Sequence, residues 1–210
     1  MSPLTSRLLP TLLFLGLAGC ATMPGDPRGP AVPDVFVQAL QSGDCRHASE
    51  LGASADAVGA NHQLQLVQVC LQRGDFLRAR QSAADFLEAF PEHRDADYVA
   101  YLRAVAGFGQ WSRAYRLEPD AVIREGRQLF LEMADYLRER PLSEYVDELA
   151  PRMIRLREGI AGAELALAER ARRNGKSDEA RARADYVLQY YPRTQAAADA
   201  ARLLMALADE

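Results

Sequence analysis

The sequence predicts an all-α fold, a tetratricopeptide-type solenoid of about five helix hairpins of which the last is incomplete. Apolar residues after Pro33 recur with the period of a helix, as in the stretches that begin at Leu64 and at Ala121. No stretch alternates apolar and polar residues for long enough to predict a β-strand. A pattern of glycine, alanine and proline also returns at a fixed spacing, which indicates stacked repeats.

The first residues of the chain have the features of a secretory signal peptide. Arg7 gives a positive start, and an apolar stretch, Leu8 to Leu17, follows it. This stretch of roughly ten residues is too short to span a bilayer, which needs about 20, but it fits the core of a signal peptide over residues 1–19. The motif Leu-Ala-Gly-Cys, which ends at Cys20, resembles the bacterial lipobox, whose cysteine is acylated after cleavage. We therefore expect lipidation of Cys20; the alternative is an ordinary signal peptide with a chance cysteine.

Residues 20–33 are expected to tie the protein to the membrane as a short tether. Four prolines and two glycines lie between Ala21 and Pro33, a composition that favours an extended chain over a helix or a sheet. Stable anchoring takes more than one acyl chain, and a fully acylated lipoprotein cysteine resembles that case. Because Ala21 rather than aspartate follows Cys20, the resemblance to known sorting signals favours the outer membrane, with the protein facing the periplasm.

Residues 34–210 have the length of one moderate domain, and nearly all of it has helical spacing. The expected helices are 34–42, 45–55, 60–73, 76–90, 95–108, 120–139, 143–173, 178–190 and 194–208. Residues 109–119 lengthen the third hairpin and are expected to emerge as an insertion on one face, often a binding face. Pro151 lies inside the seventh expected helix, so it either opens that helix late or kinks it.

The repeat is clearest at two glycines that are each followed by a proline seventeen residues later. The matched positions are Gly74 with Gly175, Ala79 with Ala180 and Pro91 with Pro192, and Gly43 begins the series. This pattern is typical of tetratricopeptide hairpins, in which glycine forms the turn, alanine lets the second helix pack closely and proline ends that helix. One hairpin cannot bury its own apolar face, so neighbouring hairpins stack. The alternative is that an alanine-rich helical chain produces such matches by chance.

Three segments resemble the BamD family, the tetratricopeptide lipoproteins of the β-barrel assembly machinery. They are Asp97, Tyr98, Val99, Tyr101 and Arg103 in one helix, Pro141 to Tyr145 in a later turn, and Tyr191 to Ala196 near the end of the chain. The resemblance implies a non-catalytic scaffold that supports folding and insertion of outer membrane proteins. The first repeat is shorter than usual in the family, and the chain ends at Glu210 without the last helix of the fifth repeat. A divergent, C-terminally shortened member is therefore expected.

The resemblance also implies partners. BamD-like proteins bind a periplasmic domain of the barrel protein BamA through their C-terminal repeats, and Arg183 aligns with an arginine that takes part. Arg173 belongs to the same arginine-rich stretch, for which a solvated charged face is the alternative. Other assembly-machinery lipoproteins and unfolded outer membrane protein clients are further expected partners. Tyr98 and Tyr101 either contact an extended client segment or pack within the repeat, and Trp111 is expected to be an exposed aromatic anchor.

Cys45 and Cys70 are the two cysteines that remain once Cys20 is lipidated. The bacterial envelope is oxidising and permits disulfides. The helices expected at 45–55 and 60–73 should run antiparallel, which places both cysteines at the same end of the pair. We expect a disulfide between them; the alternative is two buried thiols, since free cysteine packs as a small apolar side chain.

Nothing in the sequence indicates catalysis, a cofactor or a metal. His47, His62 and His93 share no ligand spacing with one another or with the cysteines. The chain has no phosphate-binding loop, no nucleophile elbow and no HExxH motif. A formal net charge of −4 gives no support for nucleic-acid binding. The alternative function is that of another periplasm-facing tetratricopeptide lipoprotein, such as a secretion pilotin or a cell-wall synthesis organiser, because fold alone does not separate these.

Overall fold

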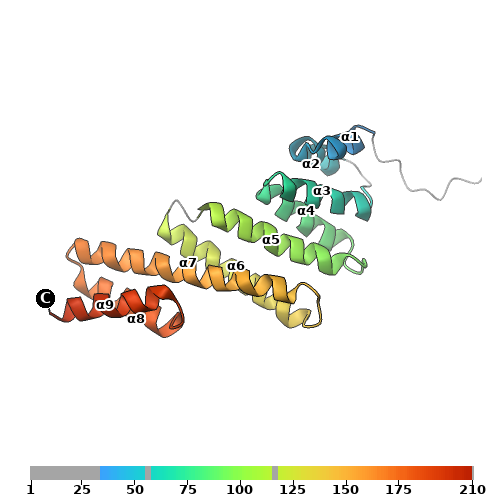
Figure 1. The fold of residues 1–210 in the computed structure, drawn as a ribbon. Helices are drawn as coiled ribbons and strands as arrows, with labels where there is room; N and C mark the ends of the chain where they lie inside the picture. Colours follow the sequence, from blue (N-terminus) through green and yellow to red (C-terminus); the bar gives the residue numbers. More distant parts are fainter. Residues whose placement is uncertain (1–33, 55–57, 115–117, 210) are drawn as a thin grey trace, which may run out of the picture. The chain divides into compact units, whose positions relative to one another are not determined.

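The computed structural model describes residues 34–54, 58–114 and 118–209, and every regular element in these ranges is an α-helix (Figure 1). The helices are α1 (Asp34–Ser42), α2 (Cys45–Ser54), α3 (Ala60–Gln72), α4 (Phe76–Ala89), α5 (Ala96–Ala114), α6 (Pro119–Glu139), α7 (Val146–Arg173), α8 (Ser177–Tyr190) and α9 (Gln195–Ala208). The all-α prediction is confirmed, and most predicted boundaries lie within one residue of the observed ones. The predicted signal peptide, the lipidation site Cys20 and the tether lie outside the described residues. Among those described, no helix has the length and apolar character needed to cross a membrane.

The helices pack as a series of antiparallel hairpins. Each helix contacts the next one along the chain, and each odd-numbered helix also contacts the next odd-numbered one, from α1 through α9. The second helix of each glycine-containing hairpin carries a fully buried alanine, namely Ala48, Ala79 or Ala180. These small side chains allow the close approach within a hairpin that the sequence predicts. The arrangement is that of a tetratricopeptide-like solenoid.

Three hairpin turns depend on glycine. Gly43, Gly74 and Gly175 adopt φ values of 72°, 69° and 71°, a left-handed conformation that side chains with a Cβ rarely adopt. An arginine from the following hairpin covers the first two turns. Arg73 donates from Nε to the carbonyl oxygen of Gly43 at 2.8 Å, and Arg113 lies so close to Gly74 that a Cβ there would meet its Nη2 at 2.6 Å. The turn at Gly175 has open space around it.

These differences predict graded effects of alanine in the turns. Gly175→Ala is expected to lower the free energy of unfolding by about 1 kcal/mol, because only the left-handed backbone is strained. Gly74→Ala should cost about 0.5–1 kcal/mol more, because the new methyl group displaces Arg113 from its position 4.6 Å above the Phe76 ring. Urea denaturation followed by circular dichroism measures both. Equal losses in the two variants would show that the Arg113 contact contributes nothing.

Helix α5 continues to Ala114, so the prediction that it ends at 108 and that an insertion begins at 109 is wrong. Two glycines of this helix, Gly107 and Gly109, serve as sites of close helix packing. A Cβ on Gly107 would lie 2.7 Å from Leu129 Cδ1 of α6, and a Cβ on Gly109 would lie 2.6 Å from the Phe76 ring of α4. Glycine in this helix therefore lets its neighbours approach rather than ending it.

Helix α7 begins at Val146 rather than at residue 143, because Ser143 is used in the turn before it. The hydroxyl of Ser143 accepts a hydrogen bond from the backbone nitrogen of Tyr145 at 3.2 Å. Pro151 lies inside the helix, five residues after its start, so of the two alternatives the late opening of the helix at Pro151 is wrong. A proline so near the first turn interrupts few helical hydrogen bonds.

Candidate protein-binding surfaces

Three tyrosines from two hairpins form a stacked cluster. Tyr98 and Tyr101 lie one turn apart on α5, and Tyr145 precedes α7. The ring centroids of Tyr101 and Tyr145 are 4.6 Å apart and nearly parallel, and those of Tyr98 and Tyr145 are 5.4 Å apart. Tyr101 is buried, whereas Tyr98 and Tyr145 are half-buried. The structure thus uses Tyr101 to pack the repeat and leaves part of Tyr98 accessible.

Burial and hydrogen bonding hold this cluster in its neutral form. The hydroxyl of Tyr101 donates to Glu148 Oε2, and burial, followed by this hydrogen bond, raises the pKa of Tyr101 to about 12. Burial raises the pKa of Tyr145 to about 12 as well. Arg152 lies 5.9 Å from the Tyr101 ring centroid. The cluster therefore consists of neutral tyrosines, with the acidic side chain of Glu148 and the basic side chain of Arg152 next to Tyr101.

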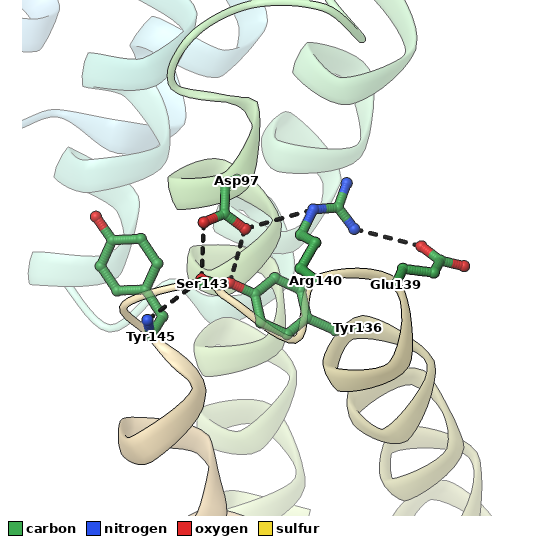
Figure 2. A network of polar contacts seen from close by, with 6 residues as sticks. All are labelled: Asp97, Tyr136, Glu139, Arg140, Ser143 and Tyr145. Carbon is green, nitrogen blue, oxygen red and sulfur yellow. Dashed lines mark hydrogen bonds and ion pairs between the residues drawn. The ribbon is translucent and has the colours of Figure 1, made fainter.

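Asp97, directly before Tyr98, fastens α5 to the turn between α6 and α7 (Figure 2). Its carboxylate accepts hydrogen bonds from the Ser143 hydroxyl at 2.7 Å and from the Tyr136 hydroxyl at 2.9 Å, and Arg140 Nε lies 3.4 Å away. Burial is the main cause that raises the pKa of Tyr136 to about 12. Two of the sequence segments that resemble BamD, at 97–103 and 141–145, are thus in direct contact.

Trp111 is buried, with 5 % of its surface exposed, so the expectation of an exposed aromatic anchor is wrong. The reason is that residues 109–114 belong to α5 and direct the indole into the main hydrophobic core. Its Nε1 donates to the carbonyl oxygen of Val122 at 3.0 Å, and its ring centroid lies 5.7 Å from that of Phe108. The same residue also lines an open groove of about 510 Å³ between α5, α7 and α9.

Arg183 lies on α8 in a cluster of charges around Glu164. Glu164 is buried at 5 % exposure, and its two oxygens lie 3.0 Å from Arg183 Nη1 and 2.7 Å from Arg127 Nη2. Arg183 Nε also lies 3.4 Å from Glu179. A buried carboxylate needs such paired donors because an unpaired buried charge is strongly unfavourable. About a third of the Arg183 side chain remains exposed, so the structure orients this arginine without covering it.

Arg173 lies apart from this charge cluster, in the last turn of α7. Two thirds of its side chain is exposed, and its only described ion pair is with Glu169 at 3.9 Å. An exposed pair at this distance contributes little to stability. Arg173 therefore remains accessible beside α9, where it lines an open recess with Arg202 and Asp199.

Cys45 and Cys70 are joined by a disulfide, with their Cα atoms 4.9 Å apart. Cys45 is the first residue of α2 and Cys70 lies near the end of α3. Both cysteines belong to the smaller, N-terminal hydrophobic cluster, which also contains Phe36 and Leu66. The bridge joins α2 of the short first hairpin to α3 of the second hairpin.

The sequence pattern did not single out Glu164, which orients Arg183, or Arg127, which pairs with the same carboxylate. The available signal is a lone acid in the otherwise apolar run from Ala161 to Leu167. An isolated carboxylate in such a stretch is either exposed or paired inside the fold. Its partners could not be read from the sequence, because Arg127 lies 37 positions away.

In the described part of the chain, no group of three or more histidines, cysteines or acids could hold a metal ion.

The helical region matches a family model. Residues 36–208, from α1 into the last turn of α9, match the model named YfiO, which is described as outer membrane lipoprotein. The match includes the tyrosine cluster, the Glu164 cluster and the disulfide.

Proposed function

This chain belongs to the YfiO family of outer membrane lipoproteins, and we propose that it is a non-catalytic scaffold of the β-barrel assembly machinery. In this role it holds a BamA-like barrel protein, together with other lipoproteins of the machinery, and meets unfolded outer membrane protein clients. Lipid on Cys20 anchors it to the outer membrane on the periplasmic side. The family match supports the membrane assignment, and the repeat fold supports a role based on protein contacts.

The position of Arg183 carries the proposal for the BamA-like partner. Its guanidinium is oriented by Glu164 and Glu179 and stays one third exposed. An arginine held in this way presents its remaining donors to a carboxylate at low entropic cost. The hairpin of α7 and α8 therefore offers a preformed contact for an acidic side chain of the partner.

The tyrosine cluster supports the client-binding part of the proposal. Tyr98 and Tyr145 are partly exposed, and Glu148 and Arg152 place one charge of each sign beside Tyr101 of the same cluster. Aromatic side chains contribute large contact areas with few rotatable bonds, which suits a surface that must accept different unfolded segments. This surface lies on α5 and the start of α7, away from Arg183 on α8.

Affinity purification of the lipidated full-length protein tests the proposal. The wild type should retain a BamA-like barrel from detergent-solubilised envelopes. Arg183→Glu should reduce the amount of retained barrel about tenfold or more, because the new carboxylate repels the acidic side chain of the partner with which Arg183 pairs. Arg183→Gln, which brings no negative charge next to Glu164, is the second variant. Thermal unfolding by circular dichroism verifies that both are folded.

Arg94→Glu is the matched control, because it reverses the charge of an arginine that is 85 % exposed in the turn before α5. It should leave binding of the barrel unchanged. Full retention by folded Arg183→Glu would remove Arg183 from the interface. Absence of a barrel from the wild-type sample, with secretion or cell-wall synthesis proteins in its place, would point to another envelope tetratricopeptide lipoprotein.

A further inference from the structure

A small aromatic recess lies between α6, α7 and α8. It has a volume of about 290 Å³ and is lined mainly by Phe130, Leu131, Arg157, Tyr186, Tyr190 and Tyr191. Tyr186 packs against Tyr190 with the two rings tilted and their centroids 4.4 Å apart, so that side of the recess is prearranged. None of these residues belongs to the tyrosine cluster or to the groove beside Trp111.

Two large hydrophobic side chains that line the recess are exposed to solvent. Leu131 is 63 % exposed and Tyr190 is 50 % exposed. Apolar surface that converges on a recess, with tyrosine and arginine at its edge, has the composition of protein interaction hot spots. A recess of this size can accept one inserted side chain of a protein partner. Binding to a membrane surface would instead require a broad apolar face.

Arg157 gives the recess a positive charge. Its Cζ lies 5.8 Å from the Phe130 ring centroid and 5.5 Å from that of Tyr191, and its Nη2 donates to the carbonyl oxygen of Tyr190 at 3.0 Å. Within the described ranges, no carboxylate lies within 4.0 Å of its guanidinium, in contrast to Arg127, which pairs with Glu164. Arg157 is therefore held in place by aromatic rings and keeps donors for a carboxylate from outside.

We infer that this recess is a docking site for an acidic segment of a protein partner. The partner inserts one apolar side chain between Leu131 and Tyr190 and places a neighbouring carboxylate on Arg157. The inference rests on the proposed function, because it assigns the recess to the partner that also meets Arg183. Arg127 links the two sites: its Cζ lies 5.1 Å from the Tyr186 ring centroid, and it shares Glu164 with Arg183. The recess supplies the apolar anchor that Arg183 by itself lacks.

Titration of the full-length lipoprotein in detergent with the purified periplasmic domains of its BamA-like barrel tests the inference. Leu131→Ser and Tyr190→Ala should each raise Kd about tenfold, as loss of an interface anchor does. Arg157→Gln should raise Kd about fivefold at low salt and make binding less dependent on salt, because one ion pair is lost. Leu77→Ser is the matched control, since Leu77 is 65 % exposed on α4, and it should leave Kd within about twofold of wild type.

The outcomes separate the two proposals. Wild-type binding that Leu131→Ser, Tyr190→Ala and Arg157→Gln all leave unchanged would overturn the recess as a docking site and leave the proposed function standing. Absence of wild-type binding would overturn both. Equal weakening by Leu77→Ser and Leu131→Ser would show a general effect of surface leucines and would also contradict the inference. Circular dichroism melts verify that each variant is folded.

Discussion

Replacement of Trp111 by alanine is expected to lower the free energy of unfolding by about 3–5 kcal/mol. The indole is 5 % exposed in the main core, and its removal leaves a cavity between α5 and α6. A Cβ on Gly126 of α6 would lie 2.8 Å from Trp111 Nε1, so the helix backbone has no side chain with which to fill that cavity. The hydrogen bond from Nε1 to the carbonyl oxygen of Val122 is lost as well.

The measurement is urea denaturation followed by far-ultraviolet circular dichroism, because Trp111 is the only tryptophan and its fluorescence is lost with it. Trp111→Phe keeps most of the packing and should cost about 1–2 kcal/mol. Tyr190→Ala removes an aromatic ring that is half exposed and should cost less than about 1 kcal/mol. A Trp111→Ala variant that unfolds at the wild-type midpoint, but loses a partner, would restore the exposed-anchor interpretation.

Loss of the Cys45–Cys70 bridge should lower the free energy of unfolding by about 3–4 kcal/mol. The two residues are 25 positions apart, and the open loop adds conformational entropy to the unfolded chain. The first hairpin depends on this restraint because α1 and α2 are the shortest helices described, with 9 and 10 residues. Alkylation of the unfolded, unreduced lipoprotein followed by mass spectrometry should label neither cysteine, and prior reduction should label both.

Single and double variants distinguish a lost bridge from lost packing. Cys45→Ser, Cys70→Ser and the double variant should all be destabilised to about the same extent, because either substitution already breaks the bond. Additive losses, or two alkylated thiols in the unreduced wild type, would instead indicate two independent buried cysteines. The free energy of unfolding of each of the three variants is compared with that of the reduced wild type.

Two of the segments that resemble BamD contact each other in the structure. Asp97 and Ser143 are 46 positions apart, yet their side chains lie 2.7 Å from one another (Figure 2). The same contact places Tyr98 and Tyr101 against Tyr145. The motif thus fastens the third hairpin to the fourth, and the surface proposed for clients is built on that junction.

The sequence by itself determined the helices and their turns. Gly43, Gly74 and Gly175 adopt left-handed φ values at the predicted turns, and Ala79 and Ala180 are fully buried where close packing was expected. These features depend on backbone preferences and on the apolar period within a few neighbouring residues, so a short window of sequence contains the information. The prediction failed from Gly109 onward, where α5 continues to Ala114 and the contact of Gly109 with the Phe76 ring of α4 outweighs the low helix propensity of glycine.

Only the tertiary structure decided which side chains are buried, which are paired and which are exposed. It buried Trp111, paired Arg183 and Arg127 with Glu164, and left Leu131, Tyr190 and Arg157 around an open recess. In each case the deciding neighbour lies on another helix, as with Arg127 and Glu164, 37 positions apart. Burial and charge pairing of a single side chain depend on how whole helices stack, and the local period of the sequence does not contain that information.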